Sequence, residues 1–142
     1  MSKIVIIGAG AMGSAFALPC LDNNHDINII GTHLENDSID QLKNNNNLHP
    51  GLNIKIPQEI KIFKFEKFNE LLKSNVDLIV LGISSKGIEW VSEQLSKVYR
   101  DKQIPNLLML TKGLIIHNNE YELLVDKVKR LLIEKGISKI NV

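Results

Sequence analysis

The stretch Lys3-Ile4-Val5-Ile6-Ile7-Gly8-Ala9-Gly10-Ala11-Met12-Gly13 runs an apolar strand directly into a turn that contains three glycines. Gly8 permits the tight turn off the strand, and Gly10 has no side chain to keep a pyrophosphate away from the backbone. Gly13 lets the following helix lie close to the sheet. The free N–H groups in the first turn of that helix then face the phosphates. The stretch therefore predicts a dinucleotide-binding turn.

The surroundings of this turn strengthen the prediction. A helix-forming run follows Gly13, and a second apolar strand at 27–30 comes where a strand–helix–strand unit requires one. Glycines that served only to pack a helix on a strand would not explain all three positions. We therefore expect a nucleotide site and not only a packing motif.

Length and composition are typical of a single compact domain. The chain has 142 residues and 44% hydrophobic content, which is enough to bury a continuous core. Seventeen Lys and Arg residues nearly balance sixteen Asp and Glu residues, so no overall field would attract nucleic acid or an anionic membrane. We expect neither as a partner, and binding must come from a local site.

The cysteines and histidines indicate the cellular compartment and whether a metal site is present. Cys20 is the only cysteine, so it has neither a disulfide partner nor a C-x-x-C motif. The N-terminus lacks a secretory signal pattern, and no apolar run approaches the roughly 20 residues that span a bilayer. We expect a cytoplasmic protein. The four histidines show no metal-ligand spacing, so we predict no metal site.

Short apolar strands alternate with amphipathic helices along the chain, a pattern that predicts an α/β fold. The expected architecture is a Rossmann-type, mainly parallel sheet with helices on both faces. We expect helices near 11–24, 36–46, 66–74, 87–99 and 120–135. We expect strands near 3–7, 27–30, 76–83 and 106–111, with shorter candidates at 60–63 and 138–142. Trp90 lies beside the apolar stripe of the helix at 87–99, so we interpret it as a packing residue.

Several motifs together resemble one family of oxidoreductases. They occur in the family's order and at about its spacing: Gly8-Ala9-Gly10-Ala11-Met12-Gly13-Ser14-Ala15, Ile29-Ile30-Gly31-Thr32-His33, His49-Pro50-Gly51, Asp77-Leu78-Ile79-Val80-Leu81-Gly82-Ile83-Ser84-Ser85 and Leu110-Thr111-Lys112-Gly113-Leu114. The chain resembles the N-terminal half of NAD(P)-dependent glycerol-3-phosphate dehydrogenases, nearest to archaeal-type members. The combination of the glycine turn, the Pro50-Gly51 loop and Thr111-Lys112-Gly113 after the fifth main strand separates this family from its relatives.

The resemblance implies an enzymatic activity and two domains, one for the cofactor and one for catalysis. Members interconvert dihydroxyacetone phosphate and sn-glycerol 3-phosphate, with a nicotinamide cofactor that carries the hydride. Their general acid–base lysine and their phosphate-binding residues lie in a helical C-terminal domain, which we expect to be absent from this chain. Residues 1–142 would then be the NAD(P)-binding domain, with a phosphorylated small molecule as substrate and with no catalytic residue of its own.

The resemblance also implies roles for individual residues. The turn that binds the pyrophosphate consists of Gly8, Gly10, Ala11, Met12 and Gly13. Thr32 and His33 face the adenosine ribose. Ile83 and Ser84 lie at the mouth of the fourth main strand, and Lys112 reaches both cofactor and substrate. Ser84 replaces a proline that is common in the family, so the loop there has its own shape.

Cofactor preference depends on the residues after the second strand. Gly31, Thr32 and His33 include no carboxylate to repel a 2′-phosphate. The Thr32 hydroxyl can donate a hydrogen bond, and a histidine such as His33 becomes a cation near the ordinary pKa of about 6.5. Glu35 and Asp37 follow closely. We therefore expect NAD(P) binding with NADPH slightly favoured.

Two alternatives remain open at this stage. One is a stand-alone nucleotide-binding regulatory module without catalysis. The other is a different two-domain NAD(P) reductase, such as a ketopantoate reductase or a 3-hydroxyacid dehydrogenase. In the two-domain case, apolar surface that the second domain covers would be exposed in this chain, so we expect self-association.

Overall fold

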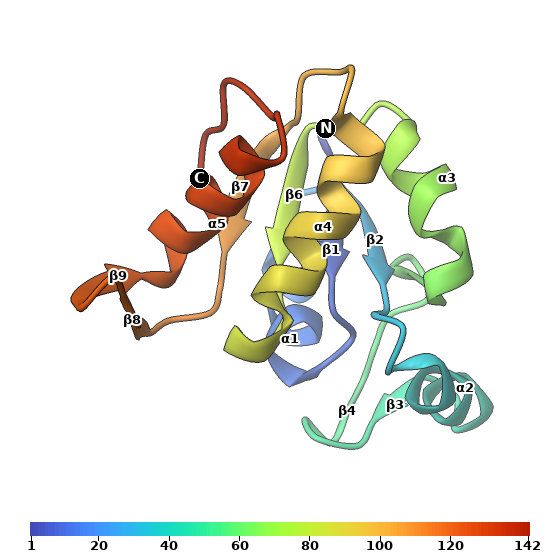
Figure 1. Cartoon of the computed structure of the whole chain (residues 1–142). Coiled ribbons are helices and arrows are strands. Elements are labelled where there is room, and N and C mark those ends of the chain that lie inside the picture. The colour runs from blue at the N-terminus through green and yellow to red at the C-terminus, as the bar shows by residue number, and fades with distance from the viewer.

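A five-stranded parallel sheet forms the centre of the computed structural model, which describes residues 1–142 (Figure 1). Its spatial order is β5-β2-β1-β6-β7, and every neighbouring pair is parallel. The strands are β1 (Lys3–Ile7), β2 (Asp26–Ile30), β5 (Lys61–Phe63), β6 (Leu78–Leu81) and β7 (Asn106–Met109). This arrangement confirms the predicted Rossmann-type fold.

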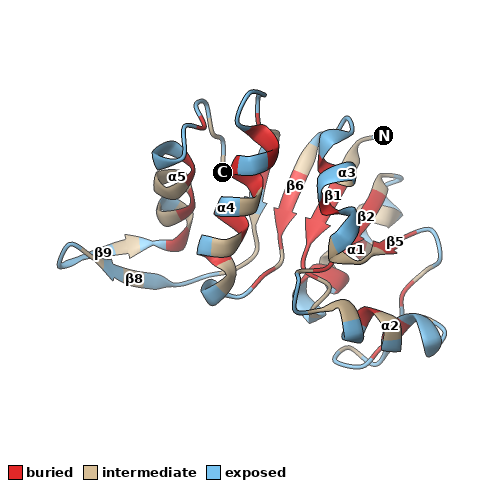
Figure 2. Cartoon of the chain, turned by 45° about the vertical axis from the view of Figure 1, so that its right-hand side comes forward, coloured by how far each residue is buried: buried red, intermediate tan, exposed pale blue.

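Helices cover both faces of this sheet, and the core is split accordingly. The α-helices are α1 (Ala11–Asp22), α2 (Asn36–Asn44), α3 (Phe68–Lys73), α4 (Ile88–Tyr99) and α5 (Leu124–Glu134). Ile4 and Ile6 of β1 belong to the core that includes side chains of α1 and α2, whereas Val5 and Ile7 belong to the core that includes α3, α4 and α5. Because both faces are covered, β1 is buried at successive positions (Figure 2), and its apolar residues do not alternate with polar ones.

The region after the fifth sheet strand corrects one prediction. The expected helix at 120–135 begins only at Leu124, because β8 (Leu114–His117) and β9 (Glu120–Leu123) pair as an antiparallel hairpin. Asn118 and Asn119 link them with φ of 51° and 64°, the left-handed conformation that a two-residue type I′ turn requires. Asparagine tolerates that conformation better than most residues, so the Asn-Asn pair was the signal for this hairpin.

Two smaller differences also appear. Residues 138–142 form no strand, although the Asn141 carbonyl accepts a hydrogen bond from the Leu107 N–H at 2.8 Å. A short antiparallel pair that was not predicted, β3 (Leu48–His49) with β4 (Ile54–Lys55), follows α2. Single 3-10 turns, η1 (Phe65–Lys67) and η2 (Ser85–Gly87), precede α3 and α4.

Parallel pairing sets the position of the functional loops. The segments that follow β1, β2, β6 and β7 leave the sheet at the same edge, which is where ligands bind in open α/β sheets. Most of the residues that the sequence singled out lie in these segments.

Candidate functional site at the carboxyl edge of the sheet

The turn between β1 and α1 is packed tightly beneath and open above. A Cβ on Gly8, whose φ is +110°, would lie 2.5 Å from the Gly82 carbonyl oxygen, and a Cβ on Gly13 would lie 2.5 Å from the Gly8 carbonyl oxygen. A Cβ on Gly10 would find nothing closer than Glu35 Oε1 at 4.0 Å. Gly8 and Gly13 are therefore needed for packing, whereas Gly10 leaves open space over the turn.

The first turn of α1 points unpaired donors toward that open space. Gly10 is the N-cap residue, and its carbonyl accepts from the Ser14 N–H at 3.0 Å. The N–H groups of Ala11, Met12 and Gly13 make no hydrogen bond within the protein. These donors, together with the positive end of the helix dipole, favour an anion at this position.

A cleft of about 500 Å³ opens beside this turn. Six of the residues predicted from the sequence line it: Gly10, Ala11, Met12, Ile83, Ser84 and Lys112. Gly82, Leu110 and Thr111 complete its wall. Thr111 Oγ1 donates to the Ile83 carbonyl and so joins the loops after β6 and β7. Lys112 is exposed at the rim.

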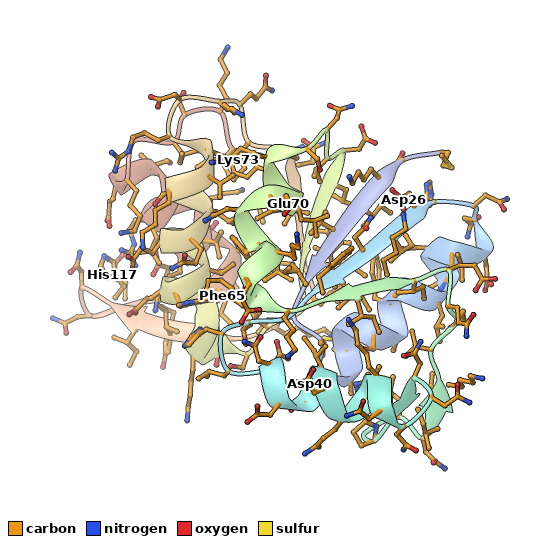
Figure 3. All side chains as sticks on the ribbon, turned by 90° about the vertical axis from the view of Figure 1, so that its right-hand side faces the viewer. Asp26, Asp40, Phe65, Glu70, Lys73 and His117 are labelled. Atoms are coloured by element: carbon orange, nitrogen blue, oxygen red, sulfur yellow. The ribbon has the colours of Figure 1, made fainter.

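Thr32 and His33 lie outside this cleft, beyond the end of β2. The Thr32 side chain is partly buried, and its N–H donates to Glu35 Oε2 at 2.7 Å. His33 is exposed and lies against Trp90, with 4.9 Å between ring centroids. Phe65, labelled in Figure 3, contacts the same tryptophan at 5.5 Å. Trp90 thus packs in an aromatic cluster, as the sequence indicated, and also supports His33.

Sequence reasoning left Glu35 and His49 out of the site. A second pocket of about 170 Å³ lies on the other side of the glycine turn, and both residues line it with Ala9 and Gly10. Glu35 could have been found from its spacing, because dinucleotide-binding domains carry an acidic residue about 20 positions after the glycine turn. His49 had no comparable signal beyond its place in His49-Pro50-Gly51.

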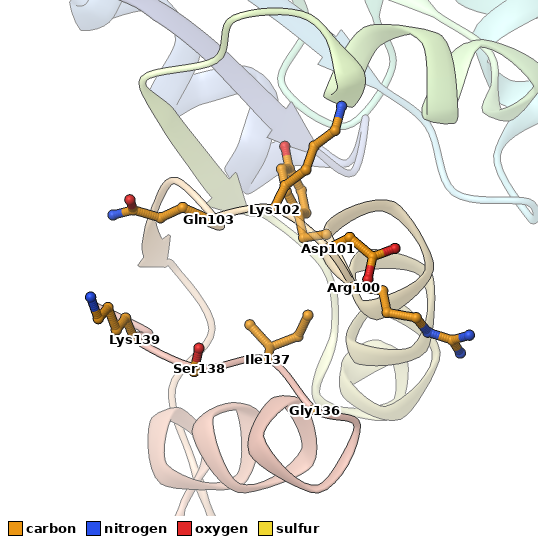
Figure 4. Close-up of a pocket in the computed structure, with 9 residues that line it drawn as sticks. Arg100, Asp101, Lys102, Gln103, Gly136, Ile137, Ser138 and Lys139 are labelled. Atoms are coloured by element: carbon orange, nitrogen blue, oxygen red, sulfur yellow. The ribbon is translucent and has the colours of Figure 1, made fainter.

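A further pocket, of about 320 Å³, lies at the opposite edge of the sheet, between the C-terminal ends of α4 and α5. Figure 4 shows the Arg100 and Lys102 side chains extending in different directions, so these cations do not converge on a ligand. No group of three or more His, Cys, Asp or Glu side chains is placed to hold a metal ion. None of the helices combines the length and apolarity needed to cross a membrane.

Comparisons with known proteins agree with this geometry. Residues 3–141 match the family described as NAD-dependent glycerol-3-phosphate dehydrogenase N-terminus. The chain is 30% identical to the NADP(+)-dependent glycerol-3-phosphate dehydrogenase of Archaeoglobus fulgidus, with 90% of this chain and 36% of the relative covered. It is 31% identical to the glycerol-3-phosphate dehydrogenase [NAD(P)+] of Fusobacterium nucleatum, with 96% and 38% covered.

Solved structures show the same fold. The crystal structure of a glycerol-3-phosphate dehydrogenase from Coxiella burnetii superposes with a TM-score of 0.73 at 17% identity. That match covers 98% of this chain and 38% of the other. The chain thus spans little more than a third of the length of the relatives it matches. It belongs to the NAD-dependent glycerol-3-phosphate dehydrogenase family, whose N-terminal part it matches over nearly its whole length.

Proposed function

We propose that residues 1–142 are the dinucleotide-binding domain of an NAD(P)-dependent glycerol-3-phosphate dehydrogenase, which interconverts dihydroxyacetone phosphate and sn-glycerol 3-phosphate. One observation carries this proposal. The open face of Gly10 and the unpaired N–H groups of α1 lie in the same cleft as Lys112. The anion-binding N–H groups of α1 and the cationic Lys112 therefore lie in one cleft at the edge of the sheet.

The residues present fit a nicotinamide dinucleotide. Its pyrophosphate would lie over Gly10 and accept from the N–H groups of Ala11 and Met12, where a Cβ on Gly10 would intrude. Thr32 and His33 would hold the adenosine ribose, and Ile83 and Ser84 would border the nicotinamide end. When bound, the cofactor supplies the hydride.

Lys112 has a task that follows from its charge and position. Its ammonium group is exposed at the cleft rim, where it can reach both a phosphate of the cofactor and an anionic substrate. As a compact positive charge, it would also stabilise the negative charge that develops on the carbonyl oxygen during reduction. We assign the general acid–base residue and the substrate phosphate contacts to the further length that the relatives carry.

The proposed setting is a cytoplasmic one, with a phosphorylated small molecule as substrate and with no nucleic acid or membrane as partner. The near balance of 17 basic and 16 acidic residues supports this assignment, as does the single cysteine.

Calorimetric titration of the 142-residue chain with NADH and with NADPH tests the proposal. Both should bind, and Gly10→Val should abolish binding because its side chain would fill the space of the pyrophosphate. Ala15→Val is the matched control, since it adds a branched side chain at an exposed position of the same helix. Failure of the chain to bind either cofactor would contradict the assignment.

Lys112 is tested by a lysine pair. Lys112→Ala should weaken dinucleotide binding severalfold, whereas Lys86→Ala should leave it unchanged, because Lys86 is also exposed beyond the sheet edge but does not line the cleft. The chain alone should not reduce dihydroxyacetone phosphate at a useful rate, because it lacks the acid–base group assigned to the remaining length. Turnover by these 142 residues would overturn that division.

A further inference from the structure

One residue of the glycine turn, Ala9, is held at its N–H and at its carbonyl by side chains distant in sequence. The Ala9 N–H donates to Glu35 Oε1 at 3.1 Å. The Ala9 carbonyl lies 3.1 Å from His49 Nε2 and also accepts from Ser14 Oγ at 3.3 Å. We call Glu35 and His49, with their hydrogen bonds to the main chain of Ala9, the Ala9 clamp.

The contacts of His49 define which ring nitrogen carries the proton. Its Nδ1 accepts from the N–H groups of Gly51 and Leu52, both at 3.2 Å, so Nδ1 bears no hydrogen. The neutral ring then carries its hydrogen on Nε2 and donates it to the Ala9 carbonyl. His49 is 5% exposed, so water does not compete for these bonds.

Glu35 links the turn to a second loop. Its Oε2 accepts from the Thr32 N–H at 2.7 Å while Oε1 holds Ala9, so one carboxylate joins the segments that follow β1 and β2. A carboxylate this close to the expected pyrophosphate would repel it. The two N–H donors and the adjacent N-terminus of α2 offset that repulsion.

We propose that Glu35 and His49 are positioning residues that hold the main chain on both sides of the Ala9 Cα, so that the donors of α1 face the pyrophosphate of the dinucleotide. This inference rests on the proposed function. Neither residue needs to touch the ligand. Gly8 and Gly10 flank Ala9 and give the turn more backbone freedom than other residues would, so an unclamped turn would occupy the binding conformation only part of the time.

The expected effect follows from that population. Apparent affinity falls by the fraction of molecules in the competent conformation, so a turn that is competent one time in ten binds about tenfold more weakly. We expect a loss of about tenfold for Glu35→Ala and for His49→Phe. Because both residues hold the main chain of Ala9, through its two adjacent peptide units, the double variant should lose much less than the product of the two single losses.

The experiment measures NADH affinity by calorimetry at a temperature where every variant is folded. Val128→Ala is the matched control: it removes buried side-chain volume in α5, on the other face of the sheet, and should lower the unfolding temperature without changing affinity. Glu35→Gln keeps a single acceptor oxygen and should lie between wild type and Glu35→Ala. The partly exposed Glu35 also provides a test if His49→Phe fails to fold.

A ligand-free measurement separates the clamp from the proposed function. Amide resonances of residues 8–13 should shift or broaden in Glu35→Ala and in His49→Phe but not in Val128→Ala. Unchanged resonances, wild-type affinity in both single variants, or affinity losses that track stability in all variants would each overturn the clamp. An intact turn that binds no dinucleotide would contradict the proposed function, and the positioning role with it.

Discussion

At the scale of single residues, the three glycines of the first turn are needed for different reasons. Gly8 and Gly13 have backbone atoms 2.5 Å from the position of an added Cβ, whereas Gly10 has none within that range. Substitution of Gly8 or Gly13 should therefore lower stability, whereas substitution of Gly10 should affect binding, although all three belong to one motif.

Thermal unfolding checks that separation. Gly13→Ala should lower stability by about 1–3 kcal/mol, because the new methyl group forces the helix away from backbone that cannot move freely. Gly10→Ala should unfold near the wild-type temperature. Unfolding is followed by circular dichroism, and equal unfolding temperatures for the two variants would contradict the packing role of Gly13.

His33 carries the prediction on cofactor preference. The side chain is exposed and supported by Trp90, so its imidazole can meet a ribose 2′-phosphate. We expect both cofactors to bind, NADPH somewhat more tightly, because the imidazole can donate a hydrogen bond to the 2′-phosphate. Glu35 keeps the difference modest, since its carboxylate lies beside Thr32.

Titrations with both cofactors test this preference. His33→Ala should bring the NADPH-to-NADH affinity ratio closer to one, while Trp90→Phe should retain the wild-type ratio. Trp90 is the only tryptophan, so its fluorescence also reports binding in the wild type. A clear preference for NADH, or an affinity ratio that His33→Ala leaves unchanged, would contradict the prediction.

At the scale of elements, Tyr99 fastens the end of α4 to α3. Its hydroxyl donates to the Leu72 carbonyl at 2.7 Å inside the core, and burial raises the pKa of Tyr99 above its ordinary value. The neutral phenol is favoured in the folded state. Its stabilising contribution is therefore full below the unfolded tyrosine pKa of about 10 and is lost as the pH rises beyond it.

Denaturant titrations between neutral pH and pH 11 measure this dependence. Tyr99→Phe should be less stable than wild type at neutral pH and should lose less stability as the pH rises. Tyr121→Phe serves as the control, because Tyr121 is 80% exposed and should keep the wild-type slope. Parallel curves for wild type and Tyr99→Phe would refute the role of the buried phenol.

At the scale of the whole molecule, the β8–β9 hairpin stands away from the sheet (Figures 1 and 2). Arg130 of α5 ties its inner side to the body through paired 2.8 Å bonds to Glu122. Its outer face is apolar and exposed: Leu114 60%, Ile116 72%, Tyr121 80% and Leu123 52%. The register pairs Leu114 with Leu123 and Ile116 with Tyr121, so the four side chains form one patch.

This patch should make the 142-residue chain self-associate, because contiguous exposed apolar surface favours association. Sedimentation velocity should show concentration-dependent species in the wild type and a shift toward monomer in Ile116→Ser with Tyr121→Ser. Glu120→Ser, at an exposed polar position of the same hairpin, is the control. A wild-type chain that stays monomeric at high concentration would count against the expectation.

Local patterns in the sequence are enough to predict the strand, glycine turn and helix at the N-terminus, the alternation of strands and helices, and the Thr111-Lys112-Gly113 segment at the sheet edge. These features are local: apolar periodicity and backbone sterics act between neighbours in the chain. The helix expected at 120–135 was partly wrong because the apolar residues of 121–124 fit a strand as well as a helix. The strand expected at 138–142 was wrong because a strand also needs a paired ladder.

Contacts between residues that are distant in sequence arise from the three-dimensional arrangement of the strands and loops. Glu35 and His49 reach Ala9 across 26 and 40 positions of sequence, and Gly82 packs against the turn from the end of β6. Such contacts depend on strand order and on the path of the loops, which local patterns do not encode. The Ala9 clamp therefore depends on how β1, β2 and β3 are arranged in space.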